Sequence, residues 1–399
     1  MTSGSPMKLI LGFSIPLLFG NLFQQFYSMV DTMIVGRVLG TGPLAAVGST
    51  GSITFLIIGF CLGLCSGFAI PVAQRFGSRD YKELRRFIGN AVWLCVGFGI
   101  VLTVLTVIFC RNILELMGTP ADIIDDAYAY LVVIFAGIPA TFLYNMLAGI
   151  QRAIGDSRTP VVILVIASII NIVLDIVLIV FIPMGVAGAA VATVASQLIG
   201  GVVCLLYVSK HYEVLKMTRE DFKINVPCIK RLLSMGLPMA LQTSITAIGS
   251  VILQASVNSL GSTVVASITA GSRLYMFFAC AYDAMGVTMS TYSGQNIGAR
   301  KIDRIGQGVK ACNIVGILYS VLALLVIVFL GKWMLLLFVD AGETAIINSA
   351  YWYLVCSGLF MIPLTFVNVL RLTIQGMGYS RLALFAGVFE ICLLYTSPS

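Results

Sequence analysis

Two aspartates lie inside long apolar segments of the sequence, where carboxylates are rare. Asp31 follows Gln24 and Gln25 in the first such segment, and Asp175 lies in the fifth, four residues after Asn171. Four residues are about one helical turn, so Asn171 and Asp175 are predicted to share a helix face. A carboxylate at membrane depth costs roughly 2.5–3.5 kcal/mol, and such residues usually face a cavity or a partner.

Carboxyl groups in this setting can take part in ion exchange. Burial favours the protonated form and a nearby cation favours the ionised form, so a membrane aspartate can exchange a proton for a cation. An ion that enters down the membrane potential gains about 2.3 kcal/mol per 100 mV for each charge, which can drive another solute the opposite way. The structural alternative is that both aspartates only hydrogen-bond to neighbouring helices. We favour the coupling role for Asp31 and Asp175 taken together, and less for either alone.

Other polar residues in or beside the apolar segments give weaker signals. Asp283 lies in the eighth segment, but the position 221 residues earlier is Leu62, so a functional role and structural hydrogen bonding are equally supported. Gln74, Gln295 and Asn296 stand where apolar segments end. We expect these three to cap helices and lock loops rather than to contact a substrate.

The composition of the chain shows what kind of element positions these residues. Hydrophobic residues make up 59% of the sequence and charged residues 10%, whereas about a quarter of residues are charged in soluble domains. Most apolar runs contain about 20 residues or more, enough for a helix across the roughly 30 Å hydrocarbon layer. The sequence therefore predicts ten membrane spans and part of an eleventh. They lie near residues 9–35, 46–72, 88–110, 126–150, 160–182, 187–208, 232–258, 263–292, 311–331, 347–372 and 381–395.

The distribution of basic residues predicts the orientation of the spans. With a cytoplasmic N-terminus, 20 of the 24 lysines and arginines fall in cytoplasmic segments, and Arg37, Arg111 and Lys332 fall outside. This asymmetry follows the positive-inside rule. The net charge of +7 therefore reflects topology and contact with anionic lipid, and no nucleic-acid partner is expected. The first apolar run has no cleavage site for a signal peptide, so it is expected to remain as a span.

Enzyme chemistry has little support in the sequence. His211 is the only histidine and lies in a loop, and the ten cysteines are scattered except for Cys61 and Cys65. Two thiols without a third ligand do not complete a zinc site. A membrane enzyme would need a nucleophile, a histidine or a metal set clustered at one depth. We therefore predict that the protein is not an enzyme.

The sequence contains an internal repeat. Residues 74–79 read Gln-Arg-Phe-Gly-Ser-Arg, and residues 295–300, which are 221 positions later, read Gln-Asn-Ile-Gly-Ala-Arg. Pro16 and Pro238 open the two copies. A duplicated membrane half is typical of transporters, whose substrate site lies between the repeats. We predict parallel repeats, with an N-terminal lobe over residues 1–208, a cytoplasmic linker over 209–230 and a C-terminal lobe over 231–399.

Four motifs at matching span positions give the chain a resemblance to a known family. They are Val30-Asp31-Thr32, Arg-Ala-Ile-Gly-Asp-Ser at 152–157, Asn-Ile-Val-Leu-Asp at 171–175 and Gly-Gln-Asn-Ile-Gly-Ala at 294–299. Across nearly its whole length the chain resembles the multidrug and toxic compound extrusion (MATE) transporters of bacteria. The resemblance implies an all-α polytopic membrane protein, with twelve spans in two pseudo-symmetric six-helix lobes and cytoplasmic termini. It also implies export of organic cations and drugs by H⁺ or Na⁺ antiport.

The resemblance also assigns roles to residues. It implies a cation-coupling site of Asp31, Asn171, Asp175 and Thr193, where H⁺ or Na⁺ is the coupling ion and no other cofactor or metal is expected. The substrate cavity is expected to include Asn145, Gln24, Gln25, Gln242 and Asp283. The seventh and tenth spans lack the carboxylates that some family members carry there, so the first half is the better candidate for ion coupling.

The resemblance predicts a monomer in the bacterial plasma membrane that exports cationic, amphipathic small molecules. The main alternative is a lipid-linked oligosaccharide flippase of related architecture. A flippase cleft is expected to carry intramembrane arginine or lysine, and Arg273 is the only candidate, so we rank this alternative lower. The sequence ends at Ser399, within or just after the eleventh span, so we expect a C-terminal truncation with foreign last residues. The role of Glu390, in that incomplete span, is left open.

Overall fold

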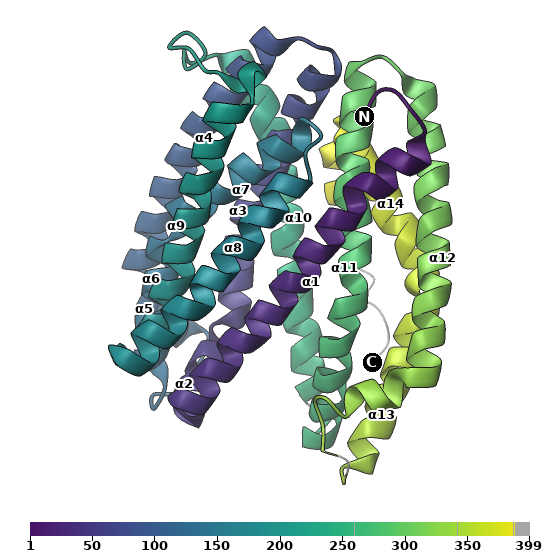
Figure 1. Ribbon diagram of the computed structural model, residues 1–399. Helices are drawn as coiled ribbons and strands as arrows, with labels where there is room; N and C mark the ends of the chain where they lie inside the picture. Colours follow the sequence, from purple (N-terminus) through teal and green to yellow (C-terminus); the bar gives the residue numbers. More distant parts are fainter. Residues whose placement is uncertain (259, 341, 386, 388–399) are drawn as a thin grey trace.

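The computed structural model describes residues 1–258, 260–340, 342–385 and 387 of the 399-residue chain. These residues form a bundle of helices joined by short turns (Figure 1). The helices are α1 (Pro6–Val38), α2 (Thr41–Ser49), α3 (Gly51–Gly77), α4 (Tyr81–Ile108), α5 (Cys110–Leu116), α6 (Ile124–Ala136), α7 (Ile138–Ala153), α8 (Arg158–Asp175) with a π-helical extension η1 (Ile176–Phe181), α9 (Val186–His211), the 3-10 turn η2 (Glu213–Leu215), α10 (Val226–Asn258), α11 (Ser262–Gly298), α12 (Ile302–Leu335), α13 (Thr344–Leu359) and α14 (Met361–Met377).

The described helices confirm the predicted number of membrane spans. Eight single helices are long and apolar enough to cross a membrane, and two bent helix pairs raise the number to ten. All ten overlap the ten complete runs predicted from the sequence. The predicted eleventh span, residues 381–395, lies mostly outside the described residues, as do Glu390 and the final residues of the chain.

Two of the predicted continuous spans are broken helices in the structure. The axes of α6 and α7 differ by 47°, and those of α13 and α14 differ by 49°. Each break precedes a proline near the start of the second helix, Pro139 in α7 and Pro363 in α14. Proline has no N–H to donate and its ring crowds the preceding turn, so a helix bends or breaks at this point. The two prolines are 224 residues apart and the breaks at Gly137 and Phe360 are 223 apart, so the repeat extends to backbone geometry.

The first helix of each half packs against the other half. Figure 1 shows α1 crossing the front of the molecule, and α1 contacts both α8 of the first half and α11 of the second. In the same way α10 packs along α3. Ile10 of α1 lies in the hydrophobic core of the second half, and Leu232 of α10, 222 residues later, lies in that of the first. Each half therefore places a residue of its first helix in the core of the other half. The lobe boundaries proposed from the sequence stay predictions.

Small residues on α3 allow the close packing against α10. A Cβ added to Gly63 would lie 2.6 Å from the Cα of Ala240, and one added to Gly67 would lie 2.5 Å from the Cα of Gly236. Close backbone approach replaces the hydrophobic effect as the source of helix association in lipid. The regularly spaced glycines of α3 therefore hold the two halves together.

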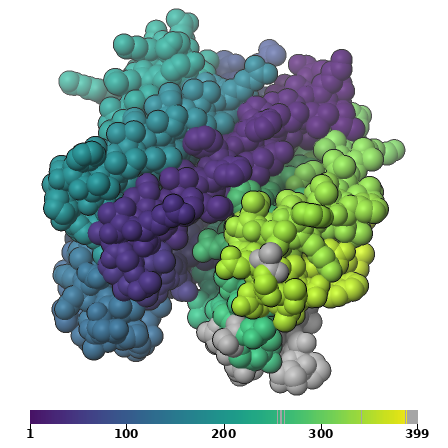
Figure 2. All heavy atoms as spheres, turned by 60° about the horizontal axis from the view of Figure 1, so that its bottom comes forward, coloured from purple at the N-terminus to yellow at the C-terminus, as the bar shows by residue number. Residues whose placement is uncertain are grey.

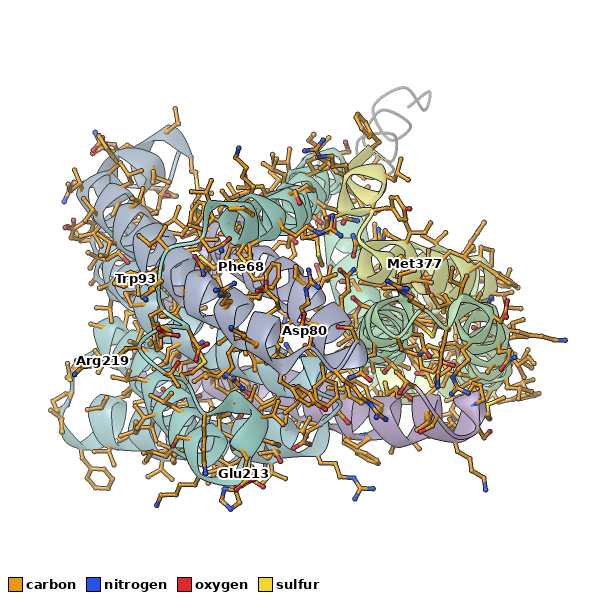
Figure 3. The ribbon with its side chains drawn as sticks, turned by 90° about the horizontal axis from the view of Figure 1, so that it is seen from above. Phe68, Asp80, Trp93, Glu213, Arg219 and Met377 are labelled. Carbon is orange, nitrogen blue, oxygen red and sulfur yellow. The ribbon has the colours of Figure 1, made fainter. Side chains whose placement is uncertain are left out.

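The duplicated motifs meet at the end of the molecule that carries residues 212–225, here called the linker end. The Gln74 side chain of α3 donates to the carbonyl oxygen of Gly376 (3.0 Å), and the Gln295 side chain of α11 donates to that of Ala153 (2.8 Å). Gly77 and Gly298 allow the ends of α3 and α11 to approach each other closely, because a Cβ at Gly77 would lie 1.9 Å from the Gln295 carbonyl oxygen. The locking role predicted for Gln74 and Gln295 is thereby confirmed. Figure 3, which looks down on the linker end, shows the helices of both halves packed side by side.

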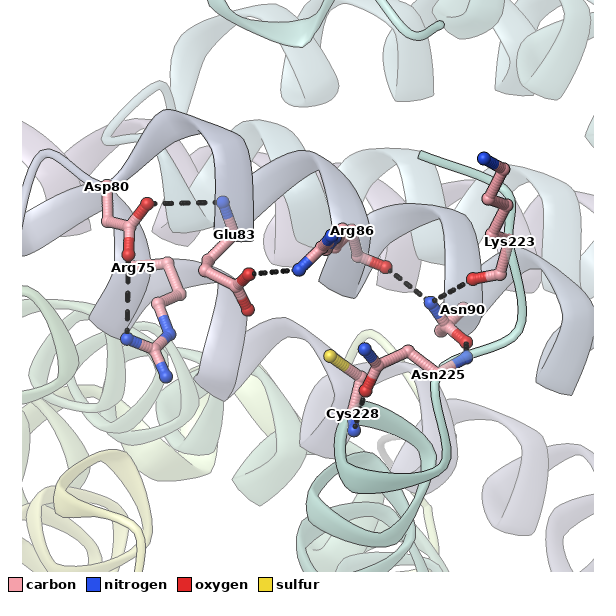
Figure 4. Close-up of polar contacts among 8 residues, drawn as sticks. All are labelled: Arg75, Asp80, Glu83, Arg86, Asn90, Lys223, Asn225 and Cys228. Atoms are coloured by element: carbon pink, nitrogen blue, oxygen red, sulfur yellow. Dashed lines mark hydrogen bonds and ion pairs between the residues drawn. The ribbon is translucent and has the colours of Figure 1, made fainter. Parts of the chain in front are cut away.

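The linker is fixed to the first half through Asn90 of α4. Asn90 is fully buried, and its side-chain amide donates to the carbonyl oxygens of Arg86 (2.9 Å) and Lys223 (3.3 Å). Its Oδ1 accepts from the backbone N–H of Asn225 (2.8 Å), as Figure 4 shows. The Trp93 indole donates to the Phe222 carbonyl oxygen (2.9 Å). The non-helical part of the linker is therefore packed against α4.

The two halves diverge at the end opposite the linker. Figure 2, with this end turned forward, shows the molecule hollowed between the first half (blue) and the second half (green). The polar bonds between Gln74, Gln295 and their partners lie at the other end. The two halves are therefore joined at the linker end and separated by a hollow at the opposite end.

Candidate functional site

The two membrane aspartates of the first half come together in the structure. Asp31 lies on α1 and Asp175 is the last residue of α8, and their carboxyl groups lie close enough to interact electrostatically. Asp175 is 0% exposed and Asn171, one turn earlier on α8, is 2% exposed. The π-helical extension η1 starts directly after Asp175. Such turns inside helices are frequent at functional sites.

Several buried polar atoms of this cluster make no hydrogen bond. Among the described residues, neither oxygen of Asp175, nor Oδ1 of Asp31, nor the side-chain amide of Asn171 has a hydrogen-bond partner. Buried polar groups in proteins are nearly always paired, so such a cluster needs an explanation. Two carboxylates in contact repel each other unless a proton or a cation lies between them. The arrangement suits a single proton or a small cation held by oxygen ligands.

The described part of the chain has no group of three or more histidine, cysteine, aspartate or glutamate side chains placed to hold a metal. The cluster therefore offers two carboxylates and an amide, with at most two negative charges. That charge fits a monovalent ion better than a divalent one, which commonly gathers more carboxylates.

Two tyrosines that the sequence did not single out flank the carboxyl groups. Tyr27 lies one turn before Asp31 on α1 and is near both carboxyl groups. Tyr130 of α6 also lies near Asp31 and Asp175. In the sequence these residues resemble ordinary aromatic core, so only their position in the fold connects them with the site.

A cavity of about 200 Å³ lies beside the carboxyl groups, within the first half. It is enclosed by α1, α3, α7, α8 and α9, and four of the predicted site residues line it: Gln24, Asn145, Asn171 and Thr193. The Asn145 amide donates to the Thr141 carbonyl oxygen (2.8 Å) and the Thr193 hydroxyl to that of Ala189 (3.0 Å). These bonds within their own helices leave the Asn145 and Thr193 side-chain oxygens to accept bonds.

The other predicted cavity residues are not brought to this cavity. Gln25 follows Gln24, so it is turned by about 100° around α1, and it lies near Cys280 of α11 instead. Gln242 of α10 accepts a 2.6 Å hydrogen bond from Gln375 of α14. The residues predicted to line one substrate cavity are therefore found in separate places. Some line the first-half cavity, and others make polar contacts in the second half.

The remaining predicted cavity residue, Asp283, belongs to the second half. It is exposed on α11, and the charged group that faces it is Arg371 of α14. The Arg371 guanidinium also donates to the Asn368 side chain (2.8 Å). Asp283 therefore has a basic neighbour, unlike the aspartates of the first half.

Arg152 is a cavity residue that the sequence analysis assigned to a cytoplasmic loop. It lies in the last turn of α7 and lines the first-half cavity. Arg273 was expected to be the only intramembrane basic candidate. Arg152 and Arg371 also lie on helices of the two broken spans, so the structure adds two further candidates. Arg273 itself is exposed. The available signal was the direction of helical side chains, which tilt towards the helix N-terminus and so carry Arg152 inward.

A protein-family model matches two parts of this chain. The model described as MatE matches residues 16–177 and residues 238–396. The two matched segments begin at Pro16 and Pro238, the prolines that open the two predicted copies of the repeat. The family match and the internal repeat therefore coincide.

Curated bacterial proteins are similar over most of the chain. The Probable multidrug resistance protein YoeA of Bacillus subtilis is 32% identical over 343 residues, which cover 83% of this chain and 73% of that protein. YpnP of the same organism, also a probable multidrug resistance protein, is 28% identical and covers 88% and 78%. The multidrug export protein MepA of Staphylococcus aureus is 22% identical over 97% of this chain and 86% of its own length.

Solved structures have the same fold. The crystal structure of MATE in complex with MaL6 superposes with a TM-score of 0.92 at 23% identity, covering 99% of this chain and 90% of that chain. An outward-facing multidrug resistance MATE transporter of the MOP superfamily gives a TM-score of 0.92 at 24% identity, covering 98% and 88%. These likenesses show the two-lobed membrane fold of all-helical transporters.

Proposed function

Because the chain belongs to the MatE family, whose members are transporters, we propose that it is a secondary active exporter of cationic, amphipathic small molecules. The relatives described above include a named multidrug export protein and two probable multidrug resistance proteins. They support drug efflux and do not favour the flippase alternative. The driving force in this proposal is the inward movement of H⁺ or Na⁺ through the Asp31–Asp175 cluster.

One observation supports the coupling mechanism above all others. The two carboxyl groups interact electrostatically beside a cavity, and among the described residues neither oxygen of Asp175 nor Oδ1 of Asp31 has a hydrogen-bond partner. With a proton or Na⁺ between them, Asp31 and Asp175 stay close. Without it, their negative charges repel and attract a cationic substrate into the cavity. Ion and substrate then compete for the same charge, which is the requirement for exchange.

The closed linker end supports a mechanism of alternating access. We place the linker end on the cytoplasmic side of the bacterial plasma membrane, in agreement with its basic residues. The described state then opens to the outside, where an ion reaches the carboxyl groups and substrate leaves. Breaking the reciprocal bonds of Gln74 and Gln295 opens the other face, where the ion leaves and substrate enters. The protein needs no cofactor beyond the coupling ion.

The test is ethidium transport by the protein in proteoliposomes, with a Na⁺ gradient and a pH gradient applied separately. We expect ethidium movement against its own gradient with at least one of the two, and no movement once both gradients are collapsed. Transport that ignores both gradients would contradict ion coupling. Gradient-driven movement of other solutes, with none of ethidium or any organic cation, would contradict the proposed substrate class.

A further inference from the structure

Arg152 holds a positive charge at the linker-end side of the first-half cavity. Among the described residues it has no ion-pair partner, and the groups that interact with it electrostatically are Tyr144, Cys65 and Cys204. All three are ordinarily neutral side chains. The guanidinium is therefore a cation without a protein anion beside it.

The path of the Arg152 side chain leads into the cavity. Arg152 lies near the C-terminal end of α7, so the natural tilt of a helical side chain carries it back towards the interior of the molecule. Its terminal nitrogen Nη2 is 3.9 Å from the position that a Cβ of Gly149 would occupy. Gly149, one turn earlier, leaves the space along which the guanidinium lies.

The acidic residues nearest to Arg152 in the sequence, or beside the cavity, interact with other groups. Asp156 accepts hydrogen bonds from the backbone N–H groups of Arg158 (2.9 Å) and Thr159 (3.0 Å) and from the Tyr212 hydroxyl. Asp31 and Asp175 interact electrostatically with each other and do not line the cavity. Arg152 therefore lines the linker end of the cavity, and the carboxyl pair lies beyond its other end, next to the lining residues Tyr27 and Asn171.

The chemistry of the guanidinium identifies what can occupy this end. Arginine stays ionised in proteins and presents N–H donors in a planar fork that matches a carboxylate or phosphate. A charge at membrane depth is costly unless it meets a counter-charge. An acidic group on a molecule in the cavity would supply that counter-charge.

We propose that Arg152 is a specificity-determining residue that binds the acidic group of an amphipathic substrate, whose basic part lies towards Asp31 and Asp175. The preferred substrates are then zwitterions rather than simple cations. This inference rests on the proposed transport function, and it names the substrate class of the same cavity. An anionic lipid headgroup has the same acidic chemistry, so the test separates lipid from substrate.

The test compares two dyes that differ in one group: tetramethylrhodamine, which has a free carboxylate, and its methyl ester. Binding is measured by fluorescence anisotropy with the protein in nanodiscs of phosphatidylcholine, which offer no acidic lipid. In the wild type we expect the free acid to bind more tightly than the ester. In Arg152→Gln the Kd of the free acid should rise about tenfold or more relative to that of the ester.

Two further variants keep the result interpretable if Arg152→Gln folds poorly. Arg152→Lys retains the charge without the fork and should recover part of the preference for the acid. Arg158→Gln is the matched control, because it removes an exposed arginine six residues later that does not line the cavity. It should leave the ratio of the two Kd values as in the wild type.

Three results would overturn the inference. Equal weakening of both dyes in Arg152→Gln would assign Arg152 a structural role, and the proposed export of drugs would stand because the wild type still binds the ester. Loss of the preference for the acid on adding phosphatidylglycerol, in the wild type but not in Arg152→Gln, would assign Arg152 to lipid. Failure of the wild type to bind either dye would count against both this inference and the proposed function.

Discussion

The two halves of the molecule share contacts that hold the fold and differ in the charges of their interiors. Ile10 of the first half lies in the core of the second, and Leu232 of the second half lies in the core of the first. Gln74 and Gln295 make reciprocal bonds at the linker end. Such contacts depend on backbone geometry and on small or neutral side chains, which both copies of the repeat supply. Interior charge is not needed to hold the scaffold, so the two halves can differ in it.

The charges of the first half are free to meet a ligand, whereas those of the second half are balanced within the protein. The first half has the Asp31–Asp175 pair and Arg152. The second half sets Arg371 beside Asp283. The residue 223 positions after Arg152 is Gln375, which is bonded to Gln242. This difference is why we propose that ion and substrate chemistry belongs to the first half.

The largest expected effect comes from removing a carboxylate of the first half. Asp175→Asn and Asp31→Asn should each lower ion-driven ethidium transport about tenfold or more. Each variant leaves only one carboxylate, so the site loses the negative charge for which the coupling ion and the cationic substrate compete. Asp283→Asn should change it less than about threefold, since the position lies outside the first-half cavity. Initial rates in proteoliposomes measure the difference. An equal loss in Asp283→Asn would remove the distinction between the halves.

The packing between the halves gives the next largest effect. Gly67→Ala places a Cβ against the backbone of Gly236, which cannot move aside as a side chain could, and should destabilise the protein by about 1–3 kcal/mol. The equivalent position on α11 is Thr288, which is fully buried. Because threonine has a Cβ, this position in the second half does not require a glycine. Thermal unfolding in detergent measures the change. Gly97→Ala is the control, because nothing lies within 4 Å of its added Cβ. A similar loss in both variants would show that the α3–α10 contact is not the cause.

The bonds that close the linker end should behave alike in the two halves. Gln74→Ala and Gln295→Ala each remove one side-chain bond to a backbone carbonyl, worth about 0.5–1.5 kcal/mol, so each should favour opening of this end. Gln295→Ala also removes the bond that Gln295 accepts from the N-terminal amine of Met1, so its effect should be at least as large as that of Gln74→Ala. Distances between spin labels on the ends of α3 and α11 report the opening. A shift in only one variant would show that the reciprocal bonds are unequal in strength.

The smallest expected effect concerns the turn between α7 and α8. Burial raises the pKa of Asp156, but hydrogen bonds from Thr159, Tyr212 and Arg158 outweigh it and hold the pKa below its ordinary value. A lowered pKa in the folded state stabilises the protein above the ordinary pKa of the carboxyl, and this stability is lost as the pH falls through the folded pKa. Asp156→Asn should therefore cost about 1 kcal/mol at neutral pH and progressively less in acid.

Unfolding midpoints measured from neutral to acidic pH test this prediction. The control is Tyr379→Phe, because Tyr379 is the equivalent of Asp156 in the second half and is not a carboxylate. Its effect should not change between neutral and acidic pH. A constant difference between Asp156→Asn and the wild type across that range would show that the carboxylate charge does not stabilise the turn.

Much of the fold could be predicted because it depends on signals that are local in the sequence. Apolar runs long enough to cross a bilayer gave the ten spans, and repeated motifs gave the two halves. The bends at Gly137 and Phe360 were not predicted from the sequence, although a proline follows each of them. An apolar run looks the same in the sequence whether or not the helix axis changes direction within it. The eleventh span lies outside the described residues.

The sequence by itself determined that Asn171 and Asp175 share a helix face, because one helix fixes that geometry, and that their setting is membranous. Only the tertiary structure brought Asp31 to Asp175, turned Gln24 into the cavity and Gln25 towards α11, and showed Arg152 lining the cavity. These outcomes depend on how separate helices cross and rotate about their axes. In lipid that rotation is set by close packing of small residues such as Gly67, which no single segment of the sequence encodes alone.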